Sequence, residues 1–110
     1  MPKSDPVPML VTYLPKKGRD KELLALIKKH GPALKKVGLI TKAPVRLWRA
    51  TDKRTGEVSF VEMFQWTDAE ASTLAHQTPE VMAVWEPMGP VLEALKLAVI
   101  EPVAPRRAKA

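Results

Sequence analysis

Four segments of the chain carry hydrophobic residues in the short, β-rich or alternating runs that are typical of strands. They are residues 8–14, 44–51, 57–66 and 94–102. The first lies between two prolines and the last is closed by Pro102. The second and third are separated by residues 52–56, which end in glycine, as hairpin loops often do. The pattern therefore predicts four strands, the middle two forming a hairpin.

The strand predicted at 57–66 is apolar on both faces. Side chains alternate along a strand, and here the apolar residues on one side are Val58, Phe60, Phe64 and Trp66, and those on the other are Val61 and Met63. Such a strand must be covered on both faces. One layer of helices covers only one, so we expect a second copy of the sheet to cover the other.

Residues 19–37 follow a helical period. The apolar positions are Leu23, Leu24, Ile27, Leu34 and Val37, and lysines fall mostly on the other side. Asp20 suits the N-terminal end of the helix dipole, and Gly38 is a stop signal. The triplet His30-Gly31-Pro32 interrupts the pattern, because proline removes a backbone donor. We therefore expect a helix broken at this point, with His30 exposed to solvent.

The stretch "FQWTDAEASTLAHQTP" (64–79) joins a strand to two short helices. Thr67 and Glu70 have the spacing of a capping box, which predicts a helix ending near His76. Thr78 and Pro79 then suit the N-cap and first position of a second helix. Pro87 and the Gly-Pro pair at 89–90 are expected to end it.

The resulting order is β-α-β-β-α-β. This order predicts an α+β, ferredoxin-like fold: a four-stranded antiparallel sheet with its helices on one face. We expect one domain at 8–103, preceded by a flexible lead-in at 1–7 and followed by a disordered basic tail at 104–110.

Composition removes several kinds of site. The 110 residues include no cysteine, which excludes disulfides, thiolate metal sites and cysteine nucleophiles. With only two histidines we expect no metal centre. No apolar run approaches the ~20 residues of a membrane span, so we expect no membrane partner and a cytoplasmic protein.

Charge is divided between the two halves of the chain. Residues 1–54 carry 14 basic and 4 acidic side chains, whereas residues 55–110 carry 4 basic and 8 acidic ones. One interpretation is two oppositely charged helices lying side by side; the other is a basic patch for nucleic acid. We expect no nucleic-acid partner, because the basic residues are Lys-rich and not interleaved with aromatics.

With these residues in place, "FQWTDAEASTLAHQTPEVMAVW" (64–85) resembles the antibiotic biosynthesis monooxygenase-like family of dimeric α+β barrels. The quinol monooxygenase branch is most similar around Gln65-Trp66 and residues 75–79. The resemblance implies a homodimer formed by sheet-to-sheet packing, with a ligand cleft between sheet and helices. It also implies cofactor-independent monooxygenation of a small hydrophobic, quinol-type aromatic. The alternative is a non-enzymatic dimeric barrel that binds a small apolar ligand.

The match to the aromatic oxygenase branch is partial. Trp66 occupies the position of that branch's tryptophan, while Glu62 stands in place of an asparagine and Ser72 in place of a tyrosine. The residues of the haem-degrading branch are absent, so the resemblance does not imply haem breakdown.

Three residues are candidates for catalysis. Trp66 would orient the substrate by stacking, and His76 or Glu62 would take its proton. The structural alternatives are a core anchor for Trp66, a helix C-terminal contact for His76, and an ion pair of Glu62 with Arg46 or Arg49. A last set, expected to line the ligand cleft, is Tyr13, Trp48, Met82 and Trp85.

Overall fold

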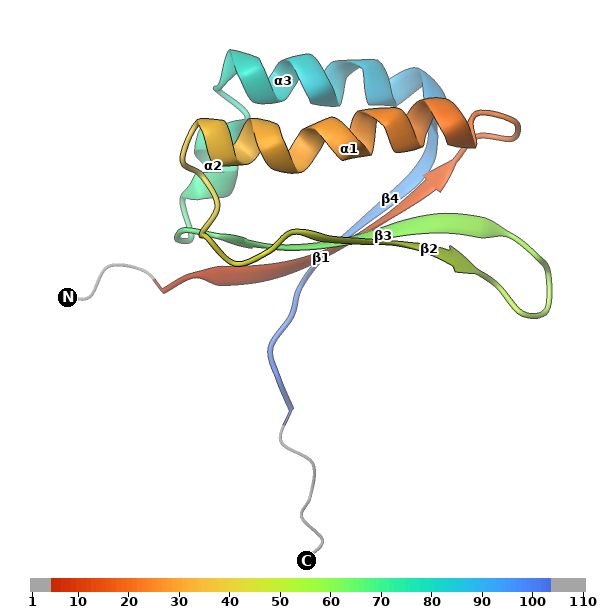
Figure 1. Ribbon diagram of the computed structural model, residues 1–110, viewed down its shortest axis with the longest axis horizontal. Coiled ribbons are helices and arrows are strands. Elements are labelled where there is room, and N and C mark those ends of the chain that lie inside the picture. Colours follow the sequence, from red (N-terminus) through yellow and green to blue (C-terminus); the bar gives the residue numbers. More distant parts are fainter. Residues whose placement is uncertain (1–4, 104–110) are drawn as a thin grey trace, which may run out of the picture.

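The computed structural model describes residues 5–103 and has the predicted order of elements (Figure 1). The elements are β1 (Val7–Pro15), α1 (Asp20–Lys36), β2 (Arg46–Thr51), β3 (Val58–Trp66), α2 (Ala71–Ala75), α3 (Pro79–Trp85), the 3-10 helix η1 (Glu86–Val91) and β4 (Leu92–Val99). The ferredoxin-like fold class is confirmed. The expected tail at 104–110 and most of the lead-in fall outside the described residues, and β1 already begins at Val7.

The four strands form one antiparallel sheet in the order β2-β3-β1-β4, with the helices on one face (Figure 1). In the central pair, Val11 lies opposite Glu62 and Tyr13 lies opposite Phe60. Because side chains alternate across a strand, these four side chains all point toward the helices. The register therefore places a tyrosine and a glutamate diagonally on the covered face.

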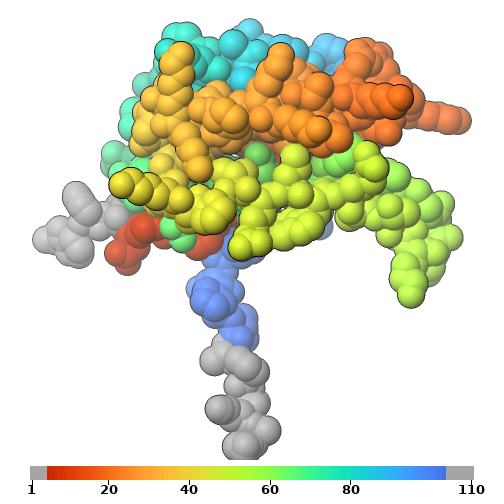
Figure 2. Space-filling model, in the orientation of Figure 1, coloured from red at the N-terminus to blue at the C-terminus, as the bar shows by residue number. Residues whose placement is uncertain are grey.

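The core lies between this face and the helices. Leu23, Ile27 and Leu34 form the buried stripe of α1, and they pack above Val11 and Phe60 of the two central strands. In the space-filling view α1 (orange) extends along the sheet above β2 (Figure 2). None of the described helices is both long and apolar enough to cross a membrane.

The break expected in α1 is wrong, since the helix runs unbroken through Pro32. Gly31 precedes the proline and has no Cβ, which relieves the steric conflict that usually bends the residue before a proline out of a helix. Pro32 itself is exposed, so water can reach the carbonyl that it leaves free. The helix does stop just before Gly38, as predicted: α1 ends at Lys36, Gly38 has a φ of 74°, and the Leu39 N–H donates to the Leu34 carbonyl.

The junction after β3 differs from the predicted capping box. The Glu70 N–H donates to Asp68 Oδ1 at 2.9 Å, so the short Asp68 side chain terminates the turn locally. Thr78 occupies the N-cap position of α3, as predicted, but its hydroxyl donates backward to the Leu74 carbonyl and makes no side-chain capping bond. Pro79 does occupy the first turn of α3, where its missing N–H costs no hydrogen bond.

The two oppositely charged helices lie side by side, as predicted, because α1 packs against α3. Their charges do not pair directly. Within residues 5–103 the ion pair between groups of fixed charge is Arg19 with Glu22, at the start of α1, while Glu62 contacts the buried His30 in the core.

Replacing Pro32 with alanine is expected to stabilise the protein by about 1 to 3 kcal/mol. A proline inside a helix is ~3 kcal/mol less favourable than alanine, but proline also restricts the unfolded chain, and losing that restriction offsets part of the gain. Chemical denaturation measures the change. Pro79→Ala is the matched control, since proline is well placed there, and it is expected to lower stability by less than about 1 kcal/mol. Equal effects at the two positions would contradict this account of α1.

Candidate functional site

A cavity of about 280 Å³ lies between the helices and the β1-β3-β4 part of the sheet. Its walls are mostly apolar and aromatic, and its polar atoms come from a few side chains. The lining consists of Met9, Val11, Tyr13, His30, Phe64, Trp66, Ser72, His76, Trp85, Met88, Gly89, Leu92, Leu95 and Leu97. This lining contains no Lys, Arg, Asp or Glu, so it favours neutral ligands over charged ones.

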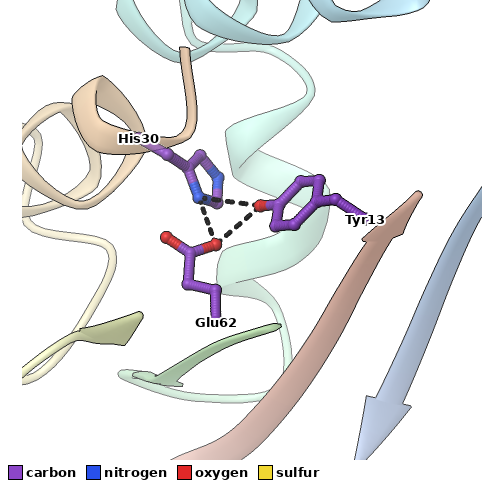
Figure 3. A network of polar contacts seen from close by, with 3 residues as sticks. All are labelled: Tyr13, His30 and Glu62. Carbon is purple, nitrogen blue, oxygen red and sulfur yellow. Dashed lines mark hydrogen bonds and ion pairs between the residues drawn. The ribbon is translucent and has the colours of Figure 1, made fainter. Parts of the chain in front are cut away.

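A buried polar network stands at the wall of this cavity (Figure 3). The Tyr13 hydroxyl donates to Glu62 Oε1 at 2.6 Å, and His30 Nδ1 lies 2.9 Å from the same oxygen. The Tyr13 oxygen is 3.5 Å from His30 Nδ1, too far for a good hydrogen bond. Glu62 Oε1 is thus the shared acceptor of both neighbours.

Three separate elements bring these groups together. Tyr13 comes from β1 and Glu62 from β3, on the diagonal set by the strand register. His30 lies on the buried stripe of α1, three residues after Ile27 and four before Leu34. The helix must therefore lie in its observed position across the sheet for the network to close.

Burial, reinforced by the adjacent Glu62 carboxylate, raises the pKa of Tyr13 far above its ordinary value. Tyr13 therefore stays protonated and acts as a donor. An ionised Glu62 can only accept, so we assign the second proton to His30 Nδ1. In neutral His30 this leaves Nε2 as a bare acceptor.

His30 Nε2 is unusual among the described residues. It is the one buried side-chain nitrogen or oxygen in residues 5–103 that has no hydrogen-bond partner. It lies across the ring from Nδ1 (Figure 3), and His30 belongs to the cavity lining. A buried polar atom without a partner costs free energy, so such an atom on a cavity wall marks a candidate ligand contact.

Aromatic rings fix the shape of the cavity. The Phe64 ring meets the Trp66 ring edge to face, with 4.9 Å between centroids, and also meets His30 nearly edge to face. The Trp85 ring contacts both histidine rings, with centroid distances of 5.8 Å to His30 and 4.8 Å to His76. Packing of this kind holds planar side chains in defined positions.

Solved structures with the same fold bear directly on this arrangement. A putative antibiotic biosynthesis monooxygenase from Bacteroides thetaiotaomicron has a TM-score of 0.68 at 16% identity, covering 93% of each chain. SnoaB, a cofactor-independent oxygenase from Streptomyces nogalater, has a TM-score of 0.65 at 14% identity, covering 93% of this chain and 99% of its own. This chain has the antibiotic biosynthesis monooxygenase-like fold.

The same fold also serves proteins of another family. A NIPSNAP family protein from Agrobacterium tumefaciens has a TM-score of 0.64 at 13% identity, covering 94% of this chain and 90% of its own. In comparisons of sequence alone, no family model and no curated protein matches the chain. The antibiotic biosynthesis monooxygenase-like likeness is therefore one of fold.

Four of the seven candidate site residues line the cavity: Tyr13, Trp66, His76 and Trp85. Trp66 is buried, while His76 is exposed at the edge. Trp48 and Met82 are not part of the lining, and Trp48 is 45% exposed on the helix-free face of the sheet.

Glu62 is not itself part of the cavity lining. It reaches the cavity through Tyr13 and His30, and it lines a separate groove between α1 and β2. The expected ion pair of Glu62 with Arg46 or Arg49 is wrong. Arg46 lies opposite Met63 and so points to the other face, while the Arg49 guanidinium sits 5.7 Å from the centre of the Phe60 ring.

The expectation that His30 is solvated is also wrong, because its exposure is 3%. This functional candidate was missed because Pro32 was interpreted as a helix break. A signal was present in the sequence: Leu23, Ile27, His30 and Leu34 follow one helical stripe at spacings of four, three and four.

Tyr13 offers a direct test of the network, because it is the single tyrosine in the chain. Its raised pKa means that its contribution to stability is complete below pH 10.0, the ordinary value, and declines above it as the unfolded state ionises first. We expect no tyrosinate absorbance from the folded protein as the pH rises past 10.0, and ionisation near 10.0 in denaturant. Ionisation of the folded protein at the ordinary pKa would contradict the network.

Proposed function

We propose that this chain is a cofactor-independent monooxygenase-like protein that acts on a small hydrophobic aromatic of the quinol type. The observation that carries the proposal is the apolar cavity, which brings Trp66 and His76 together with a buried, unpartnered histidine nitrogen. The fold adds support, since SnoaB, described as a cofactor-independent oxygenase, shares it.

The cavity favours a particular kind of ligand. Its volume of about 280 Å³ lies near the lower end for small-molecule pockets, which suits a compact ligand. Phe64, Trp66 and Trp85 offer ring faces and edges to a planar molecule. Because the lining carries no charged carboxylate, ammonium or guanidinium group, the polar side-chain groups left to the ligand are histidine nitrogens, hydroxyls and the indole N–H groups of the two tryptophans.

The proposed chemistry makes modest demands on the protein. Deprotonation turns a quinol-type substrate into an electron-rich anion that can itself reduce oxygen. When a CH₂ group becomes a carbonyl, one oxygen atom enters the product and the other leaves as water, and the substrate supplies all the electrons. The protein takes the proton, holds the anion and excludes water.

A specific observation favours the second candidate, a dimeric barrel that binds a ligand without turning it over. Glu62 and Ser72 stand where the aromatic oxygenase branch has an asparagine and a tyrosine. Both candidates share the cavity and its ligand class. The two candidates differ only in whether the protein converts the bound ligand to a product.

The assembly proposed for this function is a homodimer that packs sheet against sheet. The helix-free face (Figure 1) carries an apolar group of cross-strand neighbours: Trp48 opposite Val61, and Leu10 opposite Met63. Trp48 is exposed and the other three are half-buried in one protomer. A second copy would remove this group from water.

Oxygen consumption with a panel of quinols and anthrones tests the proposed activity. We expect oxygen uptake for ligands that bind, and we expect a Trp66→Leu variant to bind about 2- to 13-fold more weakly, the equivalent of the ~0.5–1.5 kcal/mol of an aromatic pair. Trp48→Phe, outside the cavity, is the control and is expected to bind as the parent does. Binding without oxygen uptake across the panel would favour the second candidate, and no binding would reject both.

Light scattering coupled to size-exclusion chromatography tests the assembly. We expect a dimer that Val61→Asp converts to a monomer, because a charge would have to be buried at the centre of the interface. Leu74→Asp, which changes an exposed leucine of α2, is the control and is expected to stay dimeric. A monomeric parent protein would contradict the proposal.

A further inference from the structure

We propose that His30 is the base of this site and that Glu62 is its positioning residue, so that a buried His–Glu pair removes a proton from a neutral, weakly acidic O–H ligand such as a phenol or enol. The inference rests on the proposed function for the type of reaction, and it names the residue that takes the first proton. In this proposal His30, and not His76 or Glu62, takes the proton directly from the ligand.

The geometry supplies the orientation that a base needs. Glu62 Oε1 accepts from His30 Nδ1 at 2.9 Å, which fixes the tautomer with a bare Nε2 and holds the ring in one direction. A carboxylate plays the same part behind the histidine of a Ser-His-Asp triad. The Tyr13 hydroxyl, at 2.6 Å from the same oxygen, holds the carboxylate in turn.

His76 lacks these features. It is exposed, and among the described residues its side chain makes no hydrogen bond that would select a tautomer. His30 is 3% exposed and its free nitrogen has no competing partner in residues 5–103. An incoming O–H group would therefore satisfy a buried acceptor at His30, whereas at His76 it would only exchange with water.

The proton step is simple to balance. The ligand O–H bond breaks, its electron pair stays on the ligand oxygen, and the proton forms an N–H bond at His30 Nε2. The resulting imidazolium keeps its Nδ1 proton and is stabilised by Glu62, which remains ionised. During oxygenation the same proton can return from Nε2 to the oxygen atom that leaves as water.

The titratable and charged groups around the His30–Glu62 pair come from several elements. Glu62 approaches from β3 and Tyr13 from β1, and His76 lies beyond the Trp85 ring. On the far side of Glu62, Lys28 and Lys35 line the groove between α1 and β2.

The same arrangement selects the ligand. A neutral acid gives up its proton to His30 and becomes an anion paired with an imidazolium, which is favourable in an apolar cavity. A ligand that enters already charged, such as a carboxylate, would lose its hydration without finding a lysine or arginine among the lining residues.

One test needs no ligand. The chain has two histidines, so ¹⁵N-labelled imidazole signals can be assigned by removing one of them with His30→Ala. We expect the His30 signals to report a protonated Nδ1 and a bare Nε2, and this pattern to be lost in Glu62→Gln. A His30 that is protonated at Nε2 alone, or that averages between tautomers as free histidine does, would overturn the proposal.

A second test uses 4-nitrophenol, whose phenolate absorbs in the visible. We expect the parent protein to convert the bound phenol to phenolate, His30→Ala to bind the neutral phenol without converting it, and Glu62→Gln to convert it less completely. Added imidazole is expected to restore conversion in His30→Ala. Circular dichroism confirms that each variant is folded, and Trp48→Phe is the control outside the cavity. Conversion that persists in His30→Ala and disappears in His76→Ala would overturn the proposal.

Turnover separates this inference from the proposed function. For any quinol or anthrone that the parent oxygenates, kcat in His30→Ala is expected to fall by about 100-fold or more, the range for loss of a general base. Oxygen uptake that survives in His30→Ala would overturn the role of His30 and leave the proposed function standing. Phenol conversion that depends on His30, with no oxygen uptake on any substrate, would reject the oxygenase and leave the base standing.

Discussion

The candidate site depends on one buried carboxylate. Glu62 sits in the middle of β3, is 1% exposed, and is tolerated because Oε1 accepts from both Tyr13 and His30. A buried charge without such partners would cost several kcal/mol. The strand register must place Tyr13 on the diagonal, and α1 must present His30 above it. A different strand register, or a different position of α1, would leave the Glu62 carboxylate without its partners. The contact therefore holds the helix layer and the sheet in one arrangement.

The cavity follows from the same arrangement. α1 covers the β3 side of the sheet, and α3 and η1 cover the rest only in part, so Leu95 and Leu97 of β4 remain exposed on the side that lines the cavity. His30 stands at the boundary between the packed core and this open space. One side of its ring completes the network with Glu62 (Figure 3), and the residue also belongs to the cavity lining. Core packing and ligand contact therefore use the same side chain.

Local patterns in the sequence were enough to predict the fold, because alternation and helical period are properties of short segments. Of the four residues expected at the ligand cleft, Tyr13 and Trp85 line the cavity, as do the catalytic candidates Trp66 and His76. Partner choice could not be predicted in the same way. Whether Glu62 meets Arg49 or His30 depends on how α1 crosses the sheet, which no short segment encodes.

Two other predictions, the break in α1 and the capping box at Thr67 and Glu70, are wrong for local reasons. Proline usually breaks a helix, so the pattern predicts a break at Pro32, yet the glycine before it and the exposure of the proline let the helix continue. Thr67 and Glu70 have the spacing of a capping box, but the Glu70 N–H donates its hydrogen bond to Asp68 instead. In both cases a neighbouring residue changed the outcome, and in the first the error concealed His30.

The network is hard to explain by stability alone. Apolar residues of similar volume often replace a buried ionic group at no cost, or with a gain in stability. Tyr13, His30 and Glu62 instead leave one buried nitrogen without a partner on the wall of an apolar cavity. Sites that bind or react commonly carry such a cost, since the atom that lacks a partner in the free protein is the one a ligand can satisfy. The position of that nitrogen, more than the fold shared with oxygenases, is what gives this particular chain a candidate chemistry.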